Sequence, residues 1–232
     1  MRNITNESPD NILIGRTEYI PNDFIDKTDI ENKTILEIGC GFGWFLYNII
    51  KYNPKLFSGL ENSDEKINNL KNFFTDERCS FYVGDALNLP FENDTFDTVC
   101  MFDVIEHLPK NTEDVVFKEI SRVLKSGGKL YLSTPNNHIL SVISDPAYFL
   151  IKHRHYNIYF LCDLALKHNL KPEKLYIKGR FYEILYILNL YISKWIFRRK
   201  PFLEKFFKTK SNIEYKKDGF MTIFIQYIKN SM

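Results

Sequence analysis

The fold is decided by one stretch, Thr34-Ile-Leu-Glu-Ile-Gly-Cys-Gly-Phe-Gly-Trp-Phe-Leu46. It begins with mostly apolar residues, as a buried strand does, and Glu37 is the charged exception. Gly39, Gly41 and Gly43 follow at alternate positions, after which apolar residues resume at helical spacing. Glycine tolerates a positive φ and carries no Cβ, so a glycine turn lets the backbone approach a ligand closely. The stretch therefore predicts a strand, a tight turn and a helix whose free N–H groups face a ligand. The alternative is a turn used only for packing.

The composition indicates one soluble domain. The chain has 232 residues, of which 44% are hydrophobic and 26% are charged, which is enough for a packed core. Its net charge of +2 is too small to indicate nucleic-acid binding by bulk electrostatics. No signal peptide is visible, and the longest nearly uncharged apolar run, Ile184 to Ser193, is too short to span a bilayer. These features predict a cytoplasmic protein.

The four cysteines lie far apart in the chain and form no C-x-x-C pair. Such spacing predicts free thiols in a reducing compartment and gives no indication of a metal site. The cysteines are Cys40, Cys79, Cys100 and Cys162.

Strands and helices alternate along the chain. Strands are expected at 33–38, 55–61, 79–83, 95–102, 129–134, 175–178 and 220–228. One helix is expected at 42–52, and a second begins after an Asn62 cap, with Glu65 in the capping-box position. A third is expected from Asn111 or Thr112 to a stop at Gly127-Gly128, and a fourth from an Asn157 cap to His168. Residues 135–156 are expected to form a loop. The alternation predicts an α/β fold with a mainly parallel sheet.

Acidic residues follow the predicted strands at the points where each strand ends. Ligands of an open parallel sheet bind outside the carboxyl ends of its strands. Glu61 lies 22 positions after Gly39 and can accept hydrogen bonds from two ribose hydroxyls. Asp85 follows the next strand and can accept from an exocyclic amine, so the two acids together suit an adenosine. The alternatives are a solvated strand end for Glu61 and a turn acid for Asp85.

The series of motifs resembles that of class I S-adenosylmethionine-dependent methyltransferases. The first motif is Glu37-Ile-Gly39-Cys-Gly41-Phe-Gly43. The later motifs follow in the family's order: Gly84-Asp85-Ala86, Leu89-Pro90-Phe91, Phe96-Asp97, Asp103-Val104-Ile105-Glu106-His107, and Arg122-Val123-Leu124-Lys125 with Gly127-Gly128. The chain is most similar to the type 11 branch that includes the ubiquinone-biosynthesis O-methyltransferases. The resemblance covers residues 33–135 and then fades.

The resemblance implies a fold, a cofactor and a set of binding residues. The fold would be a Rossmann-like, doubly wound, seven-stranded sheet, mainly parallel with its last strand antiparallel. The cofactor would be S-adenosylmethionine and the product S-adenosylhomocysteine. Glu37 would lie beneath the glycine turn and position it. The residues that would hold the cofactor are Glu37, Gly39, Cys40, Gly41, Gly43, Glu61, Asn62, Asp85, Ala86, Phe102, Asp103 and Val104.

A nicotinamide-binding fold is the competing interpretation of the glycine turn. Its signature is G-x-G-x-x-G, and here Trp44 occupies the position of the third glycine because Gly43 comes one residue early. An acid near Glu61 suits both folds. Asp85 and the series from Asp103 to His107 favour the methyltransferase.

His107 is the candidate catalytic base, because it follows the fourth strand close to the expected position of the methyl group. The alternative is a histidine that orders its own loop. Glu106 would orient His107, hold the acceptor or bind an ion. His153, His155 and Tyr156 are candidate acceptor-side residues, with surface histidines as the alternative. No further ligand completes a two-histidine metal site, so no metal is expected.

The segment 181–207 departs from the family pattern. It carries nine aromatic residues, and Lys194, Arg198, Arg199, Lys200 and Lys205 lie in its second half. A helix that is apolar on every side is buried or contacts lipid. The segment is therefore expected to be a lid over an apolar acceptor, an element that binds a membrane surface or a partner, or additional core. Because it leaves the carboxyl edge of the sheet, it can reach the acceptor.

The predicted protein is one methyltransferase domain over residues 1–232. Its parts are an N-terminal lead-in (1–32), a cofactor-binding core (33–135), an acceptor-side region (136–180), a helical insertion or lid (181–212) and a final strand (213–232). The predicted reaction is methyl transfer to a small-molecule or lipid-like acceptor at oxygen, in the cytoplasm or peripherally at a membrane. The alternatives are transfer to nitrogen or carbon, an RNA acceptor, and a methyltransferase-fold protein that binds without turnover. The D/N-P-P-Y/F motif of DNA base methyltransferases is replaced by Phe102-Asp103-Val104-Ile105, which argues against DNA.

Overall fold

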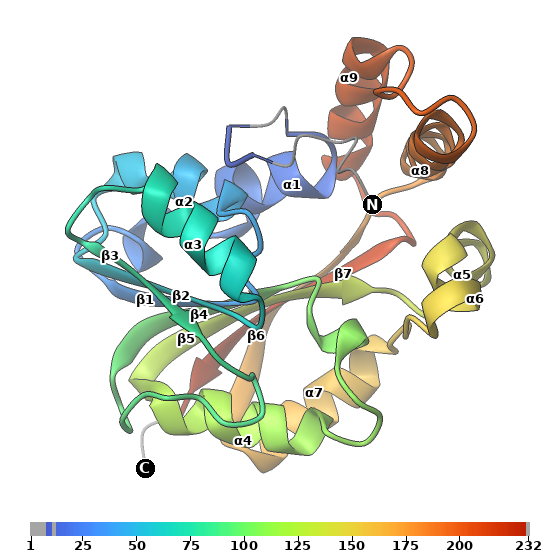
Figure 1. The fold of residues 1–232 in the computed structure, drawn as a ribbon. Coiled ribbons are helices and arrows are strands. Elements are labelled where there is room, and N and C mark those ends of the chain that lie inside the picture. The colour runs from blue at the N-terminus through green and yellow to red at the C-terminus, as the bar shows by residue number, and fades with distance from the viewer. Residues whose placement is uncertain (1–7, 11–12, 231–232) are drawn as a thin grey trace.

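A seven-stranded sheet runs through the middle of the computed structural model, which describes residues 8–10 and 13–230 (Figure 1). The strand order is β3-β2-β1-β4-β5-β7-β6. The strands β1 to β5 pair in parallel, whereas β7 lies antiparallel to both β5 and β6. The strands are β1 (Thr34–Ile38), β2 (Leu56–Glu61), β3 (Cys79–Val83), β4 (Phe96–Phe102), β5 (Leu124–Pro135), β6 (Leu170–Lys178) and β7 (Thr222–Lys229). The fold class expected from the sequence is confirmed.

Helices cover both faces of this sheet. α1, α2 and α3 lie on one face and α4 and α7 on the other, while α5, α6, α8 and α9 stand beyond its end (Figure 1). Each face has its own buried apolar cluster, which is why the central strands are apolar on both sides. The helices are α1 (Arg16–Tyr19), α2 (Trp44–Ile49), α3 (Asp64–Phe73), α4 (Glu113–Val123), α5 (Ile139–Ser144), α6 (Pro146–Ile151), α7 (Ile158–Lys167), α8 (Phe181–Trp195) and α9 (Glu204–Tyr215). Short helical turns occupy Ile20–Phe24, Lys27–Asp29, Ile50–Tyr52 and Ile105–His107.

Two of the predicted helix boundaries are wrong. The cap of α3 is Ser63, whose Oγ accepts from the backbone N–H of Lys66, so the cap lies one residue after Asn62. The helix α4 ends at Val123, and the backbone continues directly into β5. Gly127 and Gly128 therefore belong to β5 and do not stop the helix.

The predicted Asn157 cap of α7 is confirmed. The Asn157 side chain accepts from the backbone N–H of Tyr159 at the start of this helix. Asn169 follows the helix in the left-handed region, with φ of +61°. β6 then begins at Leu170, five residues earlier than expected.

The predicted loop at 135–156 contains two short helices, α5 and α6. The His138 side chain caps α5 through the N–H of Leu140. The Asp145 side chain caps α6 through the N–H of Ala147, and Pro146 occupies the first helical position. A side-chain cap followed by proline is a recognised helix start, so the sequence did carry a signal for α6.

The helical insertion consists of α8 and α9 and contributes both to the core and to the surface. Tyr215 at the end of α9 is 2% exposed and packs against Tyr19 and Phe224. Trp195 and Ile196 at the end of α8 are exposed. None of the helices in the described part of the chain is both long enough and apolar enough to cross a membrane.

Candidate functional site

A cavity of about 860 Å³ lies where β1, β2, β3 and β4 end, and we call it the strand-end cavity. Most of the residues predicted to hold a cofactor line it. They are Gly39, Gly41, Glu61, Asn62, Asp85, Ala86, Asp103 and Val104. Four others do not line it: Glu37, Cys40, Gly43 and Phe102 lie behind its wall and are buried.

The glycine turn after β1 forms the floor of the strand-end cavity. The backbone N–H groups of Gly39 and Cys40 both donate to the Leu60 carbonyl, at 2.8 and 3.0 Å. Gly41 has φ of +52°, and a Cβ built there would meet nothing closer than the Gly39 carbonyl oxygen at 4.0 Å. The turn therefore leaves open space beside Gly41, as the close approach of a ligand to the backbone requires.

Gly39 is constrained both by its backbone conformation and by a side chain that leaves no room for a Cβ. Its φ is +73°, and a Cβ there would lie 2.3 Å from Val104 Cγ2. We expect Gly39→Ala to lower the free energy of unfolding by about 2 kcal/mol, the sum of left-handed strain and overpacking. Chemical denaturation of the purified variant measures this loss.

Gly127 provides the matched control for Gly39, because it has the same φ of +73° and its Cβ would meet nothing within 4 Å. Gly127→Ala should therefore show the strain alone, about 1 kcal/mol. Equal losses in the two variants would contradict a role for the contact between Gly39 and Val104.

Glu61 at the end of β2 ties the glycine turn to the next strand. Its side chain is buried, and Oε2 accepts from the Gly41 N–H at 3.0 Å. The other oxygen, Oε1, accepts from the Asn62 N–H at 3.2 Å and lies 3.4 Å from Lys66 Nζ. A carboxylate held in this way has its position fixed before any ligand arrives and retains acceptor capacity for hydroxyls.

Glu37 lies beneath the same turn and is 2% exposed. Its Oε2 has no hydrogen-bond partner among the described residues. Burial, together with the nearby charge of Glu61, raises the pKa of Glu37 well above its usual value. Burial therefore favours the neutral form of Glu37 more than it would that of an exposed carboxyl group.

A second cavity of about 320 Å³ adjoins the first, and we call it the insertion cavity because α8 forms one of its walls. Asp103 and His107 line both cavities, so these two side chains lie at the junction. The insertion contributes Glu183, Ile187, Leu190 and Tyr191 to its wall.

Arg16 is not among the predicted site residues, yet it pairs with Asp103 at the junction of the two cavities. Its Nε lies 2.7 Å from Asp103 Oδ2. Asp103 itself has φ of +54°, and its Oδ1 accepts from Ser133 Oγ at 2.9 Å. The lead-in segment thus orients the acid that follows β4. No motif marks Arg16, because its partner is 87 positions away in the chain.

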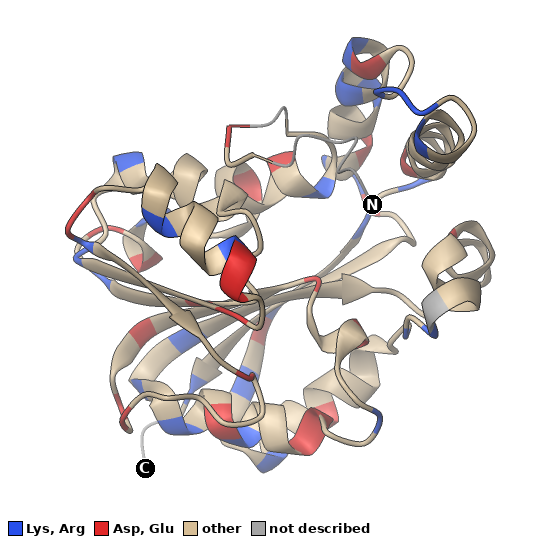
Figure 2. Cartoon of the chain, viewed as in Figure 1, with Lys and Arg blue, Asp and Glu red and all other residues tan. Residues whose placement is uncertain are grey.

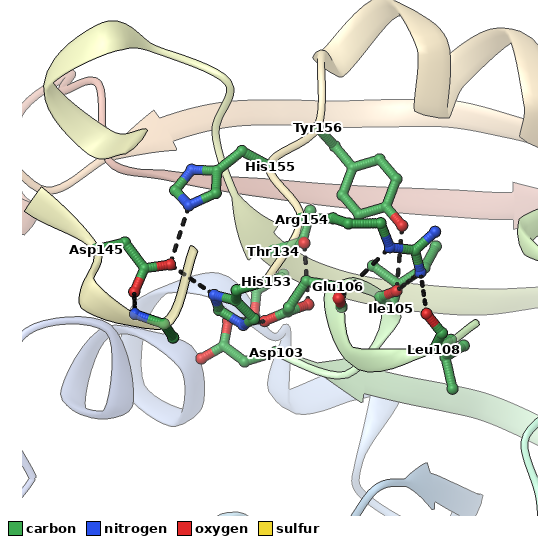
Figure 3. A network of polar contacts seen from close by, with 12 residues as sticks. Asp103, Ile105, Glu106, Leu108, Thr134, Asp145, His153, Arg154, His155 and Tyr156 are labelled. Carbon is green, nitrogen blue, oxygen red and sulfur yellow. Dashed lines mark hydrogen bonds and ion pairs between the residues drawn. The ribbon is translucent and has the colours of Figure 1, made fainter. Parts of the chain in front are cut away.

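His107 and Glu106 follow β4. Glu106 lies beside His153, a residue of the predicted loop (Figure 3). The ring of His107 lies 4.5 Å from that of His153, measured between centroids. Partial burial, and then the neighbouring His153, lower the pKa of His107, so its imidazole is neutral at pH 7. Glu106 is buried and accepts from Thr134 Oγ1 at 3.0 Å. Burial and the charge of Asp103 raise its pKa well above the usual value.

Asp145 joins the two histidines of the acceptor-side segment (Figure 3). Its Oδ2 lies 2.6 Å from His153 Nδ1 and 3.0 Å from His155 Nε2. Burial alone would raise the pKa of Asp145, but the hydrogen bonds from the two histidines lower it. His153 and His155 both line the insertion cavity.

The expectation that nothing completes a histidine metal site is wrong. Among the residues that the structure describes, two groups of side chains have ligand atoms within 4.8 Å of one another and could hold a metal ion. One group is Asp145, His153 and His155, and the other is Glu106, His107 and His153.

Tyr156 lies outside the insertion cavity, unlike the two histidines before it. It is buried, and its hydroxyl donates to the Ile105 carbonyl at 3.1 Å and contacts Glu113 Oε1 at 3.0 Å. Arg154 donates to the carbonyls of Ile105 and Leu108 from the same side (Figure 3). These residues brace the turn that carries Glu106 and His107.

Comparison with known proteins finds sequence matches within the predicted cofactor-binding core. The family model described as a methyltransferase domain matches residues 36–132. The sterol 4-C-methyltransferase strm-1 of Caenorhabditis elegans is 36% identical over 102 residues, which cover 43% of this chain and 30% of that protein. The fatty-acid O-methyltransferase of Mycolicibacterium smegmatis is 32% identical over 103 residues, 44% of this chain and 37% of that protein. The match thus spans about a third of these relatives' length.

Solved structures match over most of the chain. An S-adenosylmethionine-dependent methyltransferase from Mesorhizobium loti has a TM-score of 0.65 and 14% identity, covering 91% of this chain and 97% of its own. The geranyl diphosphate C-methyltransferase of Streptomyces coelicolor A3(2), solved with Mg²⁺, geranyl diphosphate and S-adenosylhomocysteine, also has a TM-score of 0.65 at 14% identity, covering 92% and 76%. At these identities the likeness shows the fold.

Proposed function

We propose that this chain, whose residues 36–132 match a methyltransferase domain, transfers a methyl group from S-adenosylmethionine to a lipid-like acceptor at oxygen. One observation carries the proposal. The strand-end cavity, with Glu61 and Asp85 on its wall, meets the insertion cavity at Asp103 and His107. A donor in the first cavity and an acceptor in the second would have their reacting ends at that junction.

The residues of the strand-end cavity fit the cofactor. Open space beside Gly41 admits a ligand close to the backbone, and Glu61 offers a fixed carboxylate to the ribose hydroxyls. Asp85 lines the same cavity and would accept a hydrogen bond from the adenine amine, and Ala86 is its neighbour in the chain. When bound, S-adenosylmethionine supplies an electrophilic methyl group on its sulfonium. The protein's task is then to align the acceptor with that methyl group.

His107 is the proposed base for an oxygen acceptor. Its position at the junction of the cavities is within reach of a hydroxyl that enters from the insertion cavity. The neutral imidazole can accept the hydroxyl proton at Nδ1 or Nε2. Glu106, the residue before His107, is buried, and burial together with the charge of Asp103 raises its pKa.

Carbon is the second candidate for the methylated atom, because several sterol relatives are named as C-methyltransferases. The apolar side chains that α8 contributes to the insertion cavity, Ile187 and Leu190, would suit either a sterol-like or a chain-like acceptor.

Two measurements test the proposal. The first is calorimetric titration of the purified protein with S-adenosylhomocysteine, for which micromolar affinity is expected. The second is incubation with methyl-¹³C-labelled S-adenosylmethionine and a panel of sterols, long-chain alcohols, amines and fatty acids. NMR of the product then distinguishes methyl groups on oxygen, nitrogen and carbon. Binding of the cofactor without transfer to any amphiphile would favour a small polar acceptor or RNA, and absence of cofactor binding would contradict the proposal.

We also propose that the protein works peripherally at an anionic membrane, which would supply a lipid-like acceptor. Exposed apolar side chains gather on α5, α6 and the end of α8, and α5 contacts α8. They include Ile139, Ile143, Phe149, Leu150, Trp195, Ile196 and Phe197, each at least half exposed. Basic residues follow directly in the connection from α8 to α9 (Figure 2). Apolar insertion beside a basic cluster is the arrangement that binds anionic lipid surfaces.

Replacing Phe149 and Leu150 together with serine should weaken binding to vesicles that contain phosphatidylserine by at least about tenfold, because two large apolar side chains no longer insert. Their exposed fractions are 65% and 62%. Flotation of protein with vesicles measures the change. The control pair, Leu56 and Phe73, is exposed to 47% and 45% beside the far edge of the sheet, and its replacement should have no effect. Equal loss in the two double variants would contradict the membrane proposal.

A further inference from the structure

Three side chains with metal-ligating atoms meet around one oxygen atom on the wall of the insertion cavity. Asp145 Oδ2 lies 2.6 Å from His153 Nδ1 and 3.0 Å from His155 Nε2 (Figure 3). All three residues line the cavity, and the side chains of the two histidines are only 11% and 2% exposed. Two histidines and one carboxylate are a ligand set of zinc and iron sites that keep a coordination position open.

The far side of the His155 ring is arranged as it is in a metal ligand. Its Nδ1 lies 3.1 Å from the Asn136 carbonyl oxygen, which can only accept a hydrogen bond. Its other neighbour is Ser141 Oγ, at 3.3 Å, whose own proton is donated to the Met221 carbonyl. These contacts assign a proton to Nδ1, so in the neutral ring the lone pair of Nε2 faces Asp145. Either a second proton on the ring or a bound cation must then lie between these two acceptors.

His153 has a comparable arrangement, with a carboxyl group on its far side. Its Nδ1 faces Asp145, whereas its Nε2 is buried and has no hydrogen-bond partner among the described residues. Glu106 Oε1 lies 3.7 Å from this Nε2. A metal ion on Nδ1 would place the ring proton on Nε2, where Glu106 could accept it after a small movement. A carboxylate behind a ligating histidine is common in metal sites, because it orients the ring.

The carboxyl group of Asp145 is held in place by the start of α6. Its Oδ1 accepts from the Ala147 N–H at 2.9 Å, which leaves Oδ2 for an ion. Metal bonds of about 2.1 Å in a tetrahedral site require ligand atoms about 3.4 Å apart. The observed separations of 2.6 and 3.0 Å are shorter, so the side chains need to move apart by less than about 1 Å.

The charges around the insertion cavity favour a cation. Arg16 is the single arginine or lysine among the described residues that line it, and its guanidinium already lies 2.7 Å from a carboxylate. Imidazole and carboxylate ligands together suit transition metals such as Zn²⁺, whereas Mg²⁺ and Ca²⁺ prefer oxygen ligands. The carboxyl groups that line the cavity belong to Asp103, Glu106, Asp145 and Glu183.

We propose that Asp145, His153 and His155 bind a divalent transition-metal ion, and that its open coordination position receives the oxygen of the acceptor. The second half rests on the proposed function, because it takes the insertion cavity as the acceptor site. An alcohol bound to such an ion loses its proton more readily. His107, whose ring centroid lies 4.5 Å from that of His153, is placed to receive this proton.

Zinc binding tests the site. Protein that has been treated with a chelator and then freed of it is titrated calorimetrically with zinc chloride, and one equivalent is expected to bind with micromolar affinity or better. Asp145→Asn, which keeps the cap of α6, and His155→Ala should each bind zinc at least about tenfold more weakly, a loss that even residues behind metal ligands produce. His107→Ala should bind zinc as the wild type does, because His107 belongs only to the other candidate group. Circular dichroism shows whether each variant is folded.

His168 supplies the matched control. It also pairs with an aspartate, Asp114, at 3.0 Å, but it lines neither cavity, so His168→Ala should keep the zinc affinity of the wild type. Absence of zinc binding, or an unchanged affinity in both Asp145→Asn and His155→Ala, would overturn the metal site. A loss of affinity in His107→Ala without one in His155→Ala would place the ion elsewhere and overturn it as well.

Cobalt tests the contact between ion and acceptor, because the visible absorption of Co²⁺ depends on its ligands. Octan-1-ol added to cobalt-loaded protein with saturating S-adenosylhomocysteine should change this spectrum, whereas octane, which has the same tail without the oxygen, should not. A spectrum that the alcohol leaves unchanged would overturn this half of the inference. Failure of S-adenosylhomocysteine to bind would instead overturn the proposed function and leave the zinc result as it stands.

Discussion

A His107→Ala variant is expected to transfer methyl groups about 10²–10⁴-fold more slowly than the wild type, the range typical of a lost general base. The residue lines both cavities, and partial burial beside His153 keeps its imidazole neutral, so it is placed to take the proton of an acceptor hydroxyl. Initial rates with saturating S-adenosylmethionine and the acceptor found in the screen measure the effect. The affinity for S-adenosylhomocysteine should change little, because the purine and ribose contacts lie elsewhere.

Two controls separate a base from a histidine that only orders its loop. Free imidazole should restore part of the rate to His107→Ala, which a purely structural role does not allow. His168→Ala should keep the full rate, because His168 contacts Asp114 on the other side of the sheet and lines neither cavity. A full rate in His107→Ala, or a loss that imidazole does not restore, would argue against the base.

A Glu61→Ala variant is expected to bind S-adenosylhomocysteine about 100-fold more weakly, which corresponds to about 2.7 kcal/mol. Two causes add together. The ribose hydroxyls lose a charged acceptor, and such hydrogen bonds contribute about 1.5–3 kcal/mol. The N–H groups of Gly41 and Asn62 also lose the carboxylate that holds them at 3.0 and 3.2 Å. Calorimetry on wild type and variant measures the difference.

Variants of neighbouring acids place the Glu61 result in context. Asp85→Ala should weaken binding about tenfold, because Asp85 faces only the purine end and holds no turn except its own through the Leu87 N–H. Glu65→Ala should have no effect, because this exposed acid of the first turn of α3 does not line the cavity. Unchanged affinity in both Glu61→Ala and Asp85→Ala would mean that the strand-end cavity is not the cofactor site.

The sequence predicted those parts of the site that depend on short stretches of chain. The glycine turn is encoded within a few residues of β1, and Glu61 and Asp85 follow directly after their strands. Their positions follow from the parallel sheet alone, since the carboxyl ends of neighbouring strands meet at one edge. The fold was predictable for the same reason.

Residues that act across long separations could not be predicted in this way. Arg16 meets Asp103 and Glu183 only because the lead-in helix packs beside α9. Asp145 reaches His153 and His155 only because α5 and α6 fold the segment back on itself. Neither residue stands at a fixed spacing from its partners in the sequence. Their contacts can therefore be seen only in the tertiary structure.

Local competition explains the smaller errors. The sequence alone does not distinguish Ser63 from Asn62, because both are good caps and the choice depends on which residue leaves β2 with extended dihedrals. The Gly127-Gly128 pair suggested a helix end, yet α4 had already ended where Leu124 becomes extended and pairs with Phe96. In both cases, strand pairing decided a boundary that helix signals alone left open.

The shared wall between the two cavities has a thermodynamic consequence. Asp103 and His107 face both spaces, and Val104 between them lies against Gly39 of the turn. A ligand that shifts this segment from one side alters the free energy of binding on the other, and linkage requires the effect to be reciprocal. Donor and acceptor are therefore expected to bind cooperatively. The strength of inhibition by S-adenosylhomocysteine in the strand-end cavity would then depend on which acceptor occupies the insertion cavity.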